Sequence, residues 1–301
     1  MIRLLCAFGL ASFLLAGCED VPPRPGASPV IKKMTLNSAT LTYIEQGQGA
    51  PVVFVHGAFS DYRVWEPQRE AIAQRYRYIA LTQRYFGTDP WPDKGEQYSF
   101  ATHAADLTAF IRQLNAGRVF LVGRSYGATL SITVALQHPE LVRGVLAQEP
   151  SFVRAVTDPA QQKMLGAEAA MNAPTRAAAK AGNAAEATRL FSDWVNGQPG
   201  GFDALPPEQR AVHLDNGRTI VLHIATPAFP NVTCSDLGQM KTPLTITTGE
   251  LSRPFFKILV ETAHRCVPGS QVVSIPGGRH GSSSQNPAAF NDALLAFLAK
   301  N

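Results

Sequence analysis

Charged residues and cysteines are both scarce in this sequence, and each shortage narrows the class of protein. Charged residues make up 17% of the 301 residues, and the net charge of +4 comes from scattered lysines and arginines without a run of one sign. Nucleic acid is therefore not an expected partner. The chain needs no disulfide or metal scaffold, because 45% hydrophobic residues over this length are enough to bury a core. One domain with an insertion is the simplest organisation.

The sequence also lacks the common cofactor-binding patterns. It contains no GxxxxGK phosphate-binding loop, no GxGxxG dinucleotide fingerprint and no ligand spacing typical of a metal site. We therefore expect neither a metal nor an organic cofactor. No internal repeat is present beyond an alanine bias in the middle of the chain.

The N-terminal segment is typical of an exported protein. Residues 1–17 place Arg3 before an apolar stretch and end in Leu-Leu-Ala-Gly, directly before Cys18. This ending resembles the bacterial lipoprotein box, in which the cysteine receives the lipid; an ordinary signal peptide is the alternative. The resemblance implies a membrane anchor in the cell envelope, facing the periplasm. Glu19 does not match the Asp associated with inner-membrane retention, which favours the outer membrane.

The segment after the predicted anchor has the composition of a tether. Residues 18–29 contain four prolines and little apolar material, so we expect the folded domain to occupy residues 30–301. Cys6 would leave with the signal peptide and Cys18 would carry the lipid. Cys234 and Cys266 then remain in an oxidising compartment, and we predict that they form a disulfide. Two buried free thiols are the alternative.

Two kinds of hydrophobic pattern predict the strands. Residues 30–36 and 39–47 alternate apolar and polar side chains around Asn37 and Ser38, which indicates an antiparallel hairpin. Short apolar runs that suit strands buried on both faces of a parallel sheet cover residues 51–57, 77–83, 118–124, 142–148, 243–249 and 271–277. Helix-period stretches cover residues 63–75, 101–114, 126–138, 253–265 and 287–299. We therefore predict an α/β fold with a mostly parallel, largely eight-stranded sheet flanked by helices.

The middle of the chain interrupts this alternation. The strand signal fades at about residues 151–240, and alanine-rich stretches at residues 161–181 and 184–194 predict short helices. We interpret this segment as a helical lid inserted after the sixth strand. Its aromatic residues are expected either to line an apolar pocket or to form the small core of the lid itself; they are Phe191, Trp194, Phe202 and Phe229.

The sequence GRSYG, at residues 123–127, lies between an apolar strand run and a helix-period stretch. A sharp turn from strand to helix needs glycines to avoid a clash, and it holds the serine exposed at the edge of the sheet. The helix that follows directs its positive end toward that serine. We therefore predict that Ser125 is a nucleophile, with a simple helix N-cap as the alternative.

With this motif in this context, the chain beyond the tether resembles the α/β-hydrolase superfamily. His56 and Gly57 match the family's turn after its third strand. The resemblance implies an oxyanion hole formed by the backbone N–H of Ala58 or Phe59 together with that of Tyr126. His56 itself is expected to fix this loop rather than to transfer protons.

His280 follows the last predicted strand and precedes the last predicted helix, which matches the loop that carries the family's catalytic histidine. A serine hydroxyl is a weak nucleophile at neutral pH, so an imidazole must accept its proton during attack. A surface loop histidine is the alternative. Among the other histidines, His213 or His223 in the lid could contact a substrate.

The acid of the expected triad departs from the common pattern. Many members of the superfamily carry Asp after the seventh strand, where this chain has Ser252. Two carboxylates remain as candidates. We favour Glu149, because it follows the sixth strand at the carboxyl edge of the sheet and precedes Pro150, which would fix the turn. Glu250, two residues before the vacant position, is the alternative acid.

The resemblance implies hydrolysis of a carboxylic ester or related acyl bond of a small molecule through an acyl-Ser125 intermediate. Lactonases, amidases, carbon–carbon hydrolases and cofactor-free haloperoxidases use the same triad, so the substrate itself is not predicted. Dehalogenases and epoxide hydrolases need Asp at the position of Ser125. The alternative is a non-catalytic lipoprotein that uses the pocket for binding or scaffolding, and the missing Asp at residue 252 keeps that alternative open.

Overall fold

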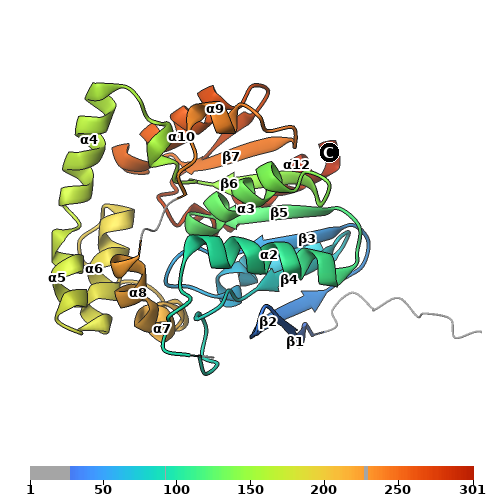
Figure 1. Cartoon of the computed structure of the whole chain (residues 1–301), viewed down its shortest axis with the longest axis horizontal. Helices are drawn as coiled ribbons and strands as arrows, with labels where there is room; N and C mark the ends of the chain where they lie inside the picture. Colours follow the sequence, from blue (N-terminus) through green and yellow to red (C-terminus); the bar gives the residue numbers. More distant parts are fainter. Residues whose placement is uncertain (1–27, 92, 227–229) are drawn as a thin grey trace, which may run out of the picture.

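The computed structural model describes residues 28–91, 93–226 and 230–301. These residues form one eight-stranded sheet and the helices around it (Figure 1). The strands are β1 (Val30–Leu36), β2 (Ala39–Gln46), β3 (Pro51–Val55), β4 (Arg77–Leu81), β5 (Val119–Arg124), β6 (Val142–Gln148), β7 (Leu244–Gly249) and β8 (Gln271–Ile275). Their order is β1-β2-β4-β3-β5-β6-β7-β8, and β2 alone runs in the direction opposite to the other seven strands. The predicted α/β fold with a mostly parallel sheet is confirmed.

The first two strands form the predicted hairpin. Leu36 pairs with Ala39, so Asn37 and Ser38 make a two-residue turn. Both turn residues have positive φ, at 46° and 64°, which is the backbone conformation that a tight hairpin turn requires. Asn adopts this left-handed conformation at lower cost than most residues, which explains why the chain reverses here.

The central strands are buried on both faces, as their continuous apolar runs predict. Along β3, Val53 and Val55 face one core, whereas Val52 and Phe54 face the other. The helices on the first face are α2 (Phe100–Leu114), α3 (Tyr126–Gln137) and α10 (Pro254–Cys266), and those on the second are α1 (Glu66–Ala73) and α12 (Pro287–Lys300). All five correspond to predicted helices, with bounds shifted by no more than three residues.

A helical insertion lies between β6 and β7, where the strand signal fades in the sequence. It comprises α4 (Pro159–Ala170), α5 (Ala173–Lys180), α6 (Ala184–Asn196), α7 (Pro207–Asn216), α8 (Ile220–Ala225) and α9 (Cys234–Leu237). Figure 1 shows that α4 to α8 gather at one end of the sheet rather than on either of its faces. This arrangement leaves the sheet faces to the flanking helices and places the insertion over one strand edge.

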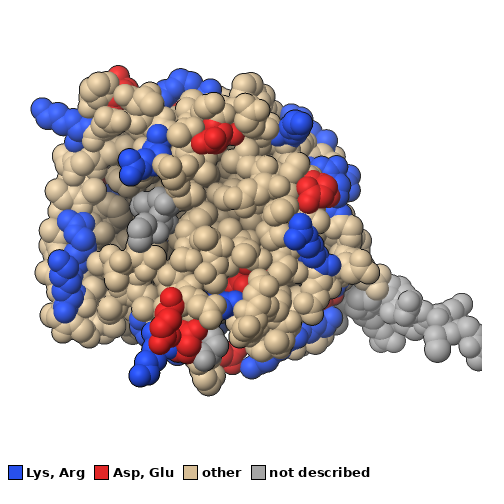
Figure 2. Space-filling model, viewed as in Figure 1, with Lys and Arg blue, Asp and Glu red and all other residues tan. Residues whose placement is uncertain are grey.

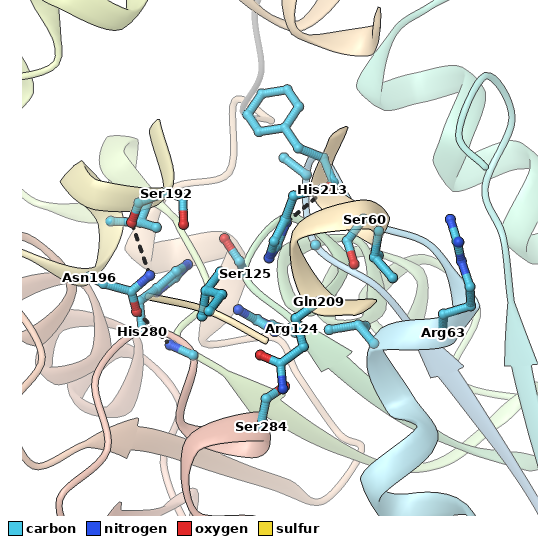
Figure 3. A pocket seen from close by; sticks show the side chains of 18 of the residues that line it. Ser60, Arg63, Arg124, Ser125, Ser192, Asn196, Gln209, His213, His280 and Ser284 are labelled. Atoms are coloured by element: carbon cyan, nitrogen blue, oxygen red, sulfur yellow. Dashed lines mark hydrogen bonds between the residues drawn. The ribbon is translucent and has the colours of Figure 1, made fainter. Parts of the chain in front are cut away.

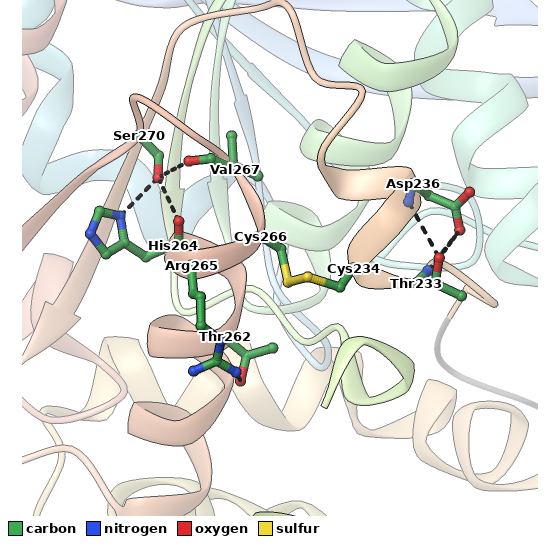
Figure 4. Close-up of a disulfide and its surroundings, with 9 residues drawn as sticks. All are labelled: Thr233, Cys234, Asp236, Thr262, His264, Arg265, Cys266, Val267 and Ser270. Atoms are coloured by element: carbon green, nitrogen blue, oxygen red, sulfur yellow. Dashed lines mark hydrogen bonds between the residues drawn. A yellow bond between two sulfur atoms is a disulfide. The ribbon is translucent and has the colours of Figure 1, made fainter. Parts of the chain in front are cut away.

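Figure 4 shows the disulfide between Cys234, the first residue of α9, and Cys266, the last residue of α10. A capping box begins α9, because the side chains of Thr233 and Asp236 each accept a hydrogen bond from the other's backbone. Since α10 packs on the sheet, the disulfide joins the C-terminal end of the insertion to the body of the domain.

Residues 1–27 lie outside the described residues, and with them the predicted signal peptide and Cys18; Phe229 of the insertion lies outside them as well. In the part of the chain that is described, no helix is both long and apolar enough to cross a membrane. Lysines, arginines and acidic residues are scattered over the face seen in Figure 2, which carries no continuous patch of either sign.

Candidate active site

A cavity of about 520 Å³ lies between the carboxyl edge of the sheet and the helical insertion. Gly57, Ser125 and His280 line it from loops that follow β3, β5 and β8. Phe191 and His213 line it from α6 and α7 of the insertion. Figure 3 shows Ser125 with His280 on one side and His213 on the other. Parallel strands bring their carboxyl ends to one edge, so segments far apart in the sequence meet at this cavity.

Ser125 lies in a strained turn between β5 and α3. Its φ of 52° and ψ of −115° are unfavourable for a residue with a side chain, at a typical cost of about 1–3 kcal/mol. A Cβ at Gly123 would lie 2.5 Å from Ala128 Cα, and one at Gly127 would lie 2.2 Å from Val55 O. The two glycines therefore permit the close packing that holds the turn, and the serine side chain faces the cavity.

Gln148, the last residue of β6, connects the serine turn to the histidine loop. Its backbone oxygen accepts a hydrogen bond from Ser125 N at 2.7 Å. Its side-chain Nε2 donates to the backbone oxygen of His280, also at 2.7 Å. One buried residue thus fixes both loops against the same strand end, which limits their movement relative to each other.

Glu149 is fully buried and accepts hydrogen bonds from four donors. His280 Nδ1 donates to Oε2 at 2.5 Å, while Thr248 Oγ1 at 2.8 Å, Gly249 N at 3.0 Å and Ser252 Oγ donate to Oε1. Burial of a carboxylate costs several kcal/mol, but hydrogen bonds to a charged group contribute about 1.5–3 kcal/mol each. Burial raises the pKa of Glu149, and the contacts with His280, Ser252 and Thr248 more than offset it, so this pKa is lowered.

The two other positions considered for the acid have different surroundings. Ser252 does not leave a gap, because its hydroxyl bonds the carboxylate that reaches the site from the neighbouring strand. Glu250 is exposed, and its Oε2 accepts a hydrogen bond from Gly277 N at 2.8 Å. Within the described residues Glu250 forms no hydrogen bond with His280. The geometry therefore brings Glu149, and not Glu250, to the histidine.

His280 is buried between Glu149 and the ring of Phe256, which stacks on it at a centroid distance of 3.8 Å. Because Nδ1 donates to the carboxylate, Nε2 carries the free lone pair and can accept a proton. Burial lowers the pKa of His280, the Glu149 carboxylate opposes this shift, and the positive charge of Arg124 adds to it. No hydrogen bond joins Ser125 Oγ to His280 in the described structure, and such contacts often tighten only when substrate binds.

The loop after β3 is held in place by its histidine. His56 is buried, donates through Nδ1 to Gly57 O at 2.7 Å and accepts at Nε2 from Gln83 N at 3.0 Å. Burial lowers the pKa of His56 to about 4, so the ring is neutral and fits this tautomer. His56 therefore has the loop-fixing surroundings that the sequence predicts.

The backbone groups expected to form an oxyanion hole lie around Ser125. Tyr126 N–H is the first of helix α3, where no acceptor exists within the helix. Ala58 and Phe59 both line the cavity, and Phe59 has a positive φ of 54°. Phe59 O is bonded to His213 Nδ1 at 3.0 Å, so a helix of the insertion supports this loop.

The described aromatic residues of the insertion have different surroundings, and only Phe191 of them lines the cavity. Phe191 lines the cavity and packs edge to face against Phe59 at a centroid distance of 4.6 Å. Trp194 instead packs against Phe255 and Phe256 of α10, in the core between insertion and domain. Phe202 is buried and does not line the cavity.

Sequence reasoning missed several polar side chains of the cavity. Arg124, the residue before the serine, lines it, as do Asn196 of α6 and Gln285 beside the histidine loop. The position of Arg124 inside GRSYG is a signal that could have identified it, because the neighbours of an exposed turn residue tend to share its surroundings. Asn196 and Gln285 carry no such local signal.

A strained serine turn after β5, a histidine loop after β8 and a carboxylate at the end of β6, all at one edge of this sheet, define a protein of the α/β-hydrolase type. The family model described as alpha/beta hydrolase fold matches residues 50–283. The chain therefore belongs to this family.

Individual relatives have the same architecture. The chain is 27% identical over 276 residues to 2-(acetamidomethylene)succinate hydrolase of Mesorhizobium japonicum, which covers 89% of this chain and 95% of the relative. A crystal structure of E-2-(acetamidomethylene)succinate hydrolase has a TM-score of 0.66 at 22% identity, covering 90% of this chain and 100% of that one. A bromoperoxidase from Bacillus anthracis has a TM-score of 0.71 at 24% identity, with coverage of 90% and 100%. At these identities the solved structures show the shared fold.

An NMR titration of the His280 imidazole tests the balance of forces around it. We expect a pKa below the ordinary histidine value of about 6.5, because burial disfavours the charged ring more than Glu149 stabilises it. Glu149→Gln should lower this pKa further, since it removes the opposing negative charge. A wild-type value above 6.5, or an increase in the variant, would contradict this account.

Proposed function

We propose that this protein is a serine hydrolase that cleaves a carboxylic ester or related acyl bond of a small molecule. The observation that carries the proposal is the 2.5 Å hydrogen bond from His280 to Glu149 beside the strained turn of Ser125. All three residues lie at the carboxyl edge of the sheet, where the cavity gives a substrate access to the serine.

In this mechanism Ser125 Oγ attacks the carbonyl carbon while His280 Nε2 accepts its proton. Glu149 keeps the imidazole in the required tautomer and stabilises the imidazolium that forms. The tetrahedral intermediate then expels the alcohol or amine, which takes the proton from His280. Water, activated by the same imidazole, hydrolyses the acyl-Ser125 ester and restores the free enzyme.

The backbone around the serine suits the charge that develops on the substrate oxygen. Tyr126 N–H, at the start of α3, would donate to this oxygen together with the N–H of Ala58 or Phe59. These donors are held in place before the reaction, so they stabilise the transition state more than the neutral carbonyl. Loss of one such donor typically costs about 10²- to 10³-fold in rate.

The relatives support an acyl compound of modest size. The Mesorhizobium relative is named for hydrolysis of 2-(acetamidomethylene)succinate, an acetamido compound. The alternative of a non-catalytic binding protein drew on the absence of Asp at residue 252. The contact of Ser252 with Glu149 weakens that reason, because a carboxylate reaches the histidine from the sixth strand instead.

We also propose that the protein is exported and anchored by a lipid on Cys18, facing the periplasm at the outer membrane. The support is the sequence Leu-Leu-Ala-Gly-Cys after an apolar stretch. A tether of residues 18–29 would then connect the lipid to the hydrolase domain, and the substrate would be met outside the cytoplasm.

Ser125→Ala should abolish ester turnover, with a loss of about 10⁶-fold in kcat that leaves only background hydrolysis. Incubation of the wild-type protein with a fluorophosphonate should give one adduct, which peptide mass spectrometry maps to Ser125. Thermal unfolding checks that the variant keeps its fold. Turnover retained by Ser125→Ala, or an adduct elsewhere, would overturn the assignment of the nucleophile.

Glu149→Gln should lower kcat/KM by about 10³- to 10⁴-fold, because the imidazole loses the partner that sets its tautomer. Glu250→Gln is the matched control, since that carboxylate bonds Gly277 N and lies away from the histidine. Steady-state kinetics with one chromogenic ester compares the two variants directly. The reverse ranking would identify Glu250 as the acid.

Cys18→Ser should move the protein from the membrane fraction to the soluble fraction of the cell envelope, because the lipid attachment site is lost. Cys6→Ser is the control, since Cys6 lies inside the predicted signal peptide. Immunoblots of fractionated cells, with metabolic labelling by an alkyne palmitate analogue, measure both outcomes. Unchanged fractionation of Cys18→Ser would exclude the anchor.

A further inference from the structure

Arg124 is a positively charged side chain in the cavity wall without a partner of its own. It precedes Ser125 directly and lines the cavity together with it. Within the described residues the guanidinium of Arg124 forms neither an ion pair nor a hydrogen bond. Figure 3 shows it on the wall between Ser125 and Gln209, which reaches down from the insertion.

Two other arginines of the domain, unlike Arg124, are paired with carboxylates. Arg84, buried in the domain, is paired with Asp106 at 2.7 Å. Arg63, which also lines the cavity, is bonded to Asp61 at 2.7 Å and to Asp215 at 2.8 Å. Arg124 has no equivalent carboxylate. Arg124 is partly buried, and a partly desolvated charge without a counter-charge is unfavourable, so such a group in a cavity is a candidate for binding a ligand of opposite charge.

The nearest acid does not serve as the missing partner. Both oxygens of Glu149 are occupied by the four donors described above, including His280. Burial lowers the pKa of Arg124 to about 10, and the charge of Glu149 partly opposes that shift. The guanidinium therefore remains protonated at neutral pH and keeps its donors available on the cavity side.

A second donor converges on the same space. A Cβ at Gly281 would lie 3.1 Å from Gln285 Nε2 and 3.5 Å from Arg124 Nη2, so both nitrogens lie close to Gly281, and all three residues line the cavity. Gln285 Nε2 donates one hydrogen to Asn196 Oδ1 at 3.2 Å, and its second hydrogen is not used in the described structure. The cavity wall at Gly281 thus carries a cation and an amide donor close together, and a carboxylate can accept hydrogen bonds from both.

We propose that Arg124 and Gln285 bind a free carboxylate of the substrate, so that the preferred substrates are acyl compounds that also carry a carboxylate. This rests on the proposed hydrolase function and specifies its substrate class. The carboxylate would replace the missing counter-charge of Arg124 and hold the scissile bond beside Ser125. Water would be displaced from the guanidinium only by a ligand that satisfies its donors, so neutral acyl compounds would bind less well.

The test compares esters that differ only in the carboxylate. Mono-4-nitrophenyl adipate carries the carboxylate on the acyl side, and 4-nitrophenyl hexanoate is its neutral counterpart. 4-(Carboxymethyl)phenyl acetate carries the carboxylate on the alcohol side, and its methyl ester is the neutral counterpart. The kcat/KM values are measured with the purified protein at pH 8, where His280 is neutral. We expect the anionic ester of at least one pair to be preferred by about 10-fold or more, the range of a hydrogen bond to a charged group.

Arg124→Gln should remove most of this preference and bring the kcat/KM ratio of the pair close to 1, mainly through a higher KM for the anionic ester. Arg124→Lys keeps the charge without the planar fork and should retain part of the preference. Gly281→Ala, which places a Cβ close to both nitrogens, should also reduce it. The matched control is Arg210→Gln on α7, because Arg210 bonds Asp203 O and does not line the cavity.

Labelling of Ser125 by a fluorophosphonate reports whether each variant keeps an intact serine turn. Equal kcat/KM within both ester pairs, or a preference that Arg124→Gln leaves unchanged, would overturn the carboxylate site while leaving the hydrolase proposal in place. Absence of both labelling and turnover in the wild-type protein would instead overturn the hydrolase function. Calorimetric titration of Ser125→Ala with adipate then decides the site alone: binding that Arg124→Gln removes supports it, and no binding overturns it.

Discussion

The hydrogen bond between the buried Glu149 carboxylate and His280 is the interaction on which the candidate site depends. A carboxylate is stable at this buried position only because four donors surround it, one of which is the imidazole itself. The same contact holds the imidazole with Nε2 toward the cavity. Burial and charge therefore act together: the surroundings that keep Glu149 ionised also orient the imidazole that would accept the serine proton in the proposed mechanism.

This interaction is possible because the sheet brings distant segments to a single edge. Gln148 ends β6 and Glu149 follows it, and together they contact the serine turn, the end of β7 and the histidine loop. The register of parallel strands fixes these strand ends relative to one another, and the two core layers resist their displacement. The helical insertion covers the cavity on the side opposite the strand ends and contributes Phe191 and His213 to its wall.

Two charged side chains, Glu149 and Arg124, act on the imidazole of His280. Arg124 lowers the pKa of His280, while Glu149 raises it, so one cation and one anion act on the imidazole with opposite effects. Both carboxylate oxygens of Glu149 accept hydrogen bonds from the protein, whereas the guanidinium of Arg124 donates none within the described residues. In the proposed mechanism Glu149 would serve the reaction, and Arg124 would serve recognition of a substrate beside the serine.

The sequence by itself determined the strands, the flanking helices, the hairpin turn at Asn37 and the glycines around Ser125, because each depends on periodicity or backbone freedom within a few residues. It also favoured Glu149 over Glu250, yet it could not decide between them. Only the tertiary structure decided that Ser252 bonds Glu149, 103 residues away, and that Arg124 has no partner. Such contacts depend on how the strand ends are placed in space, and no local pattern of residues encodes that placement.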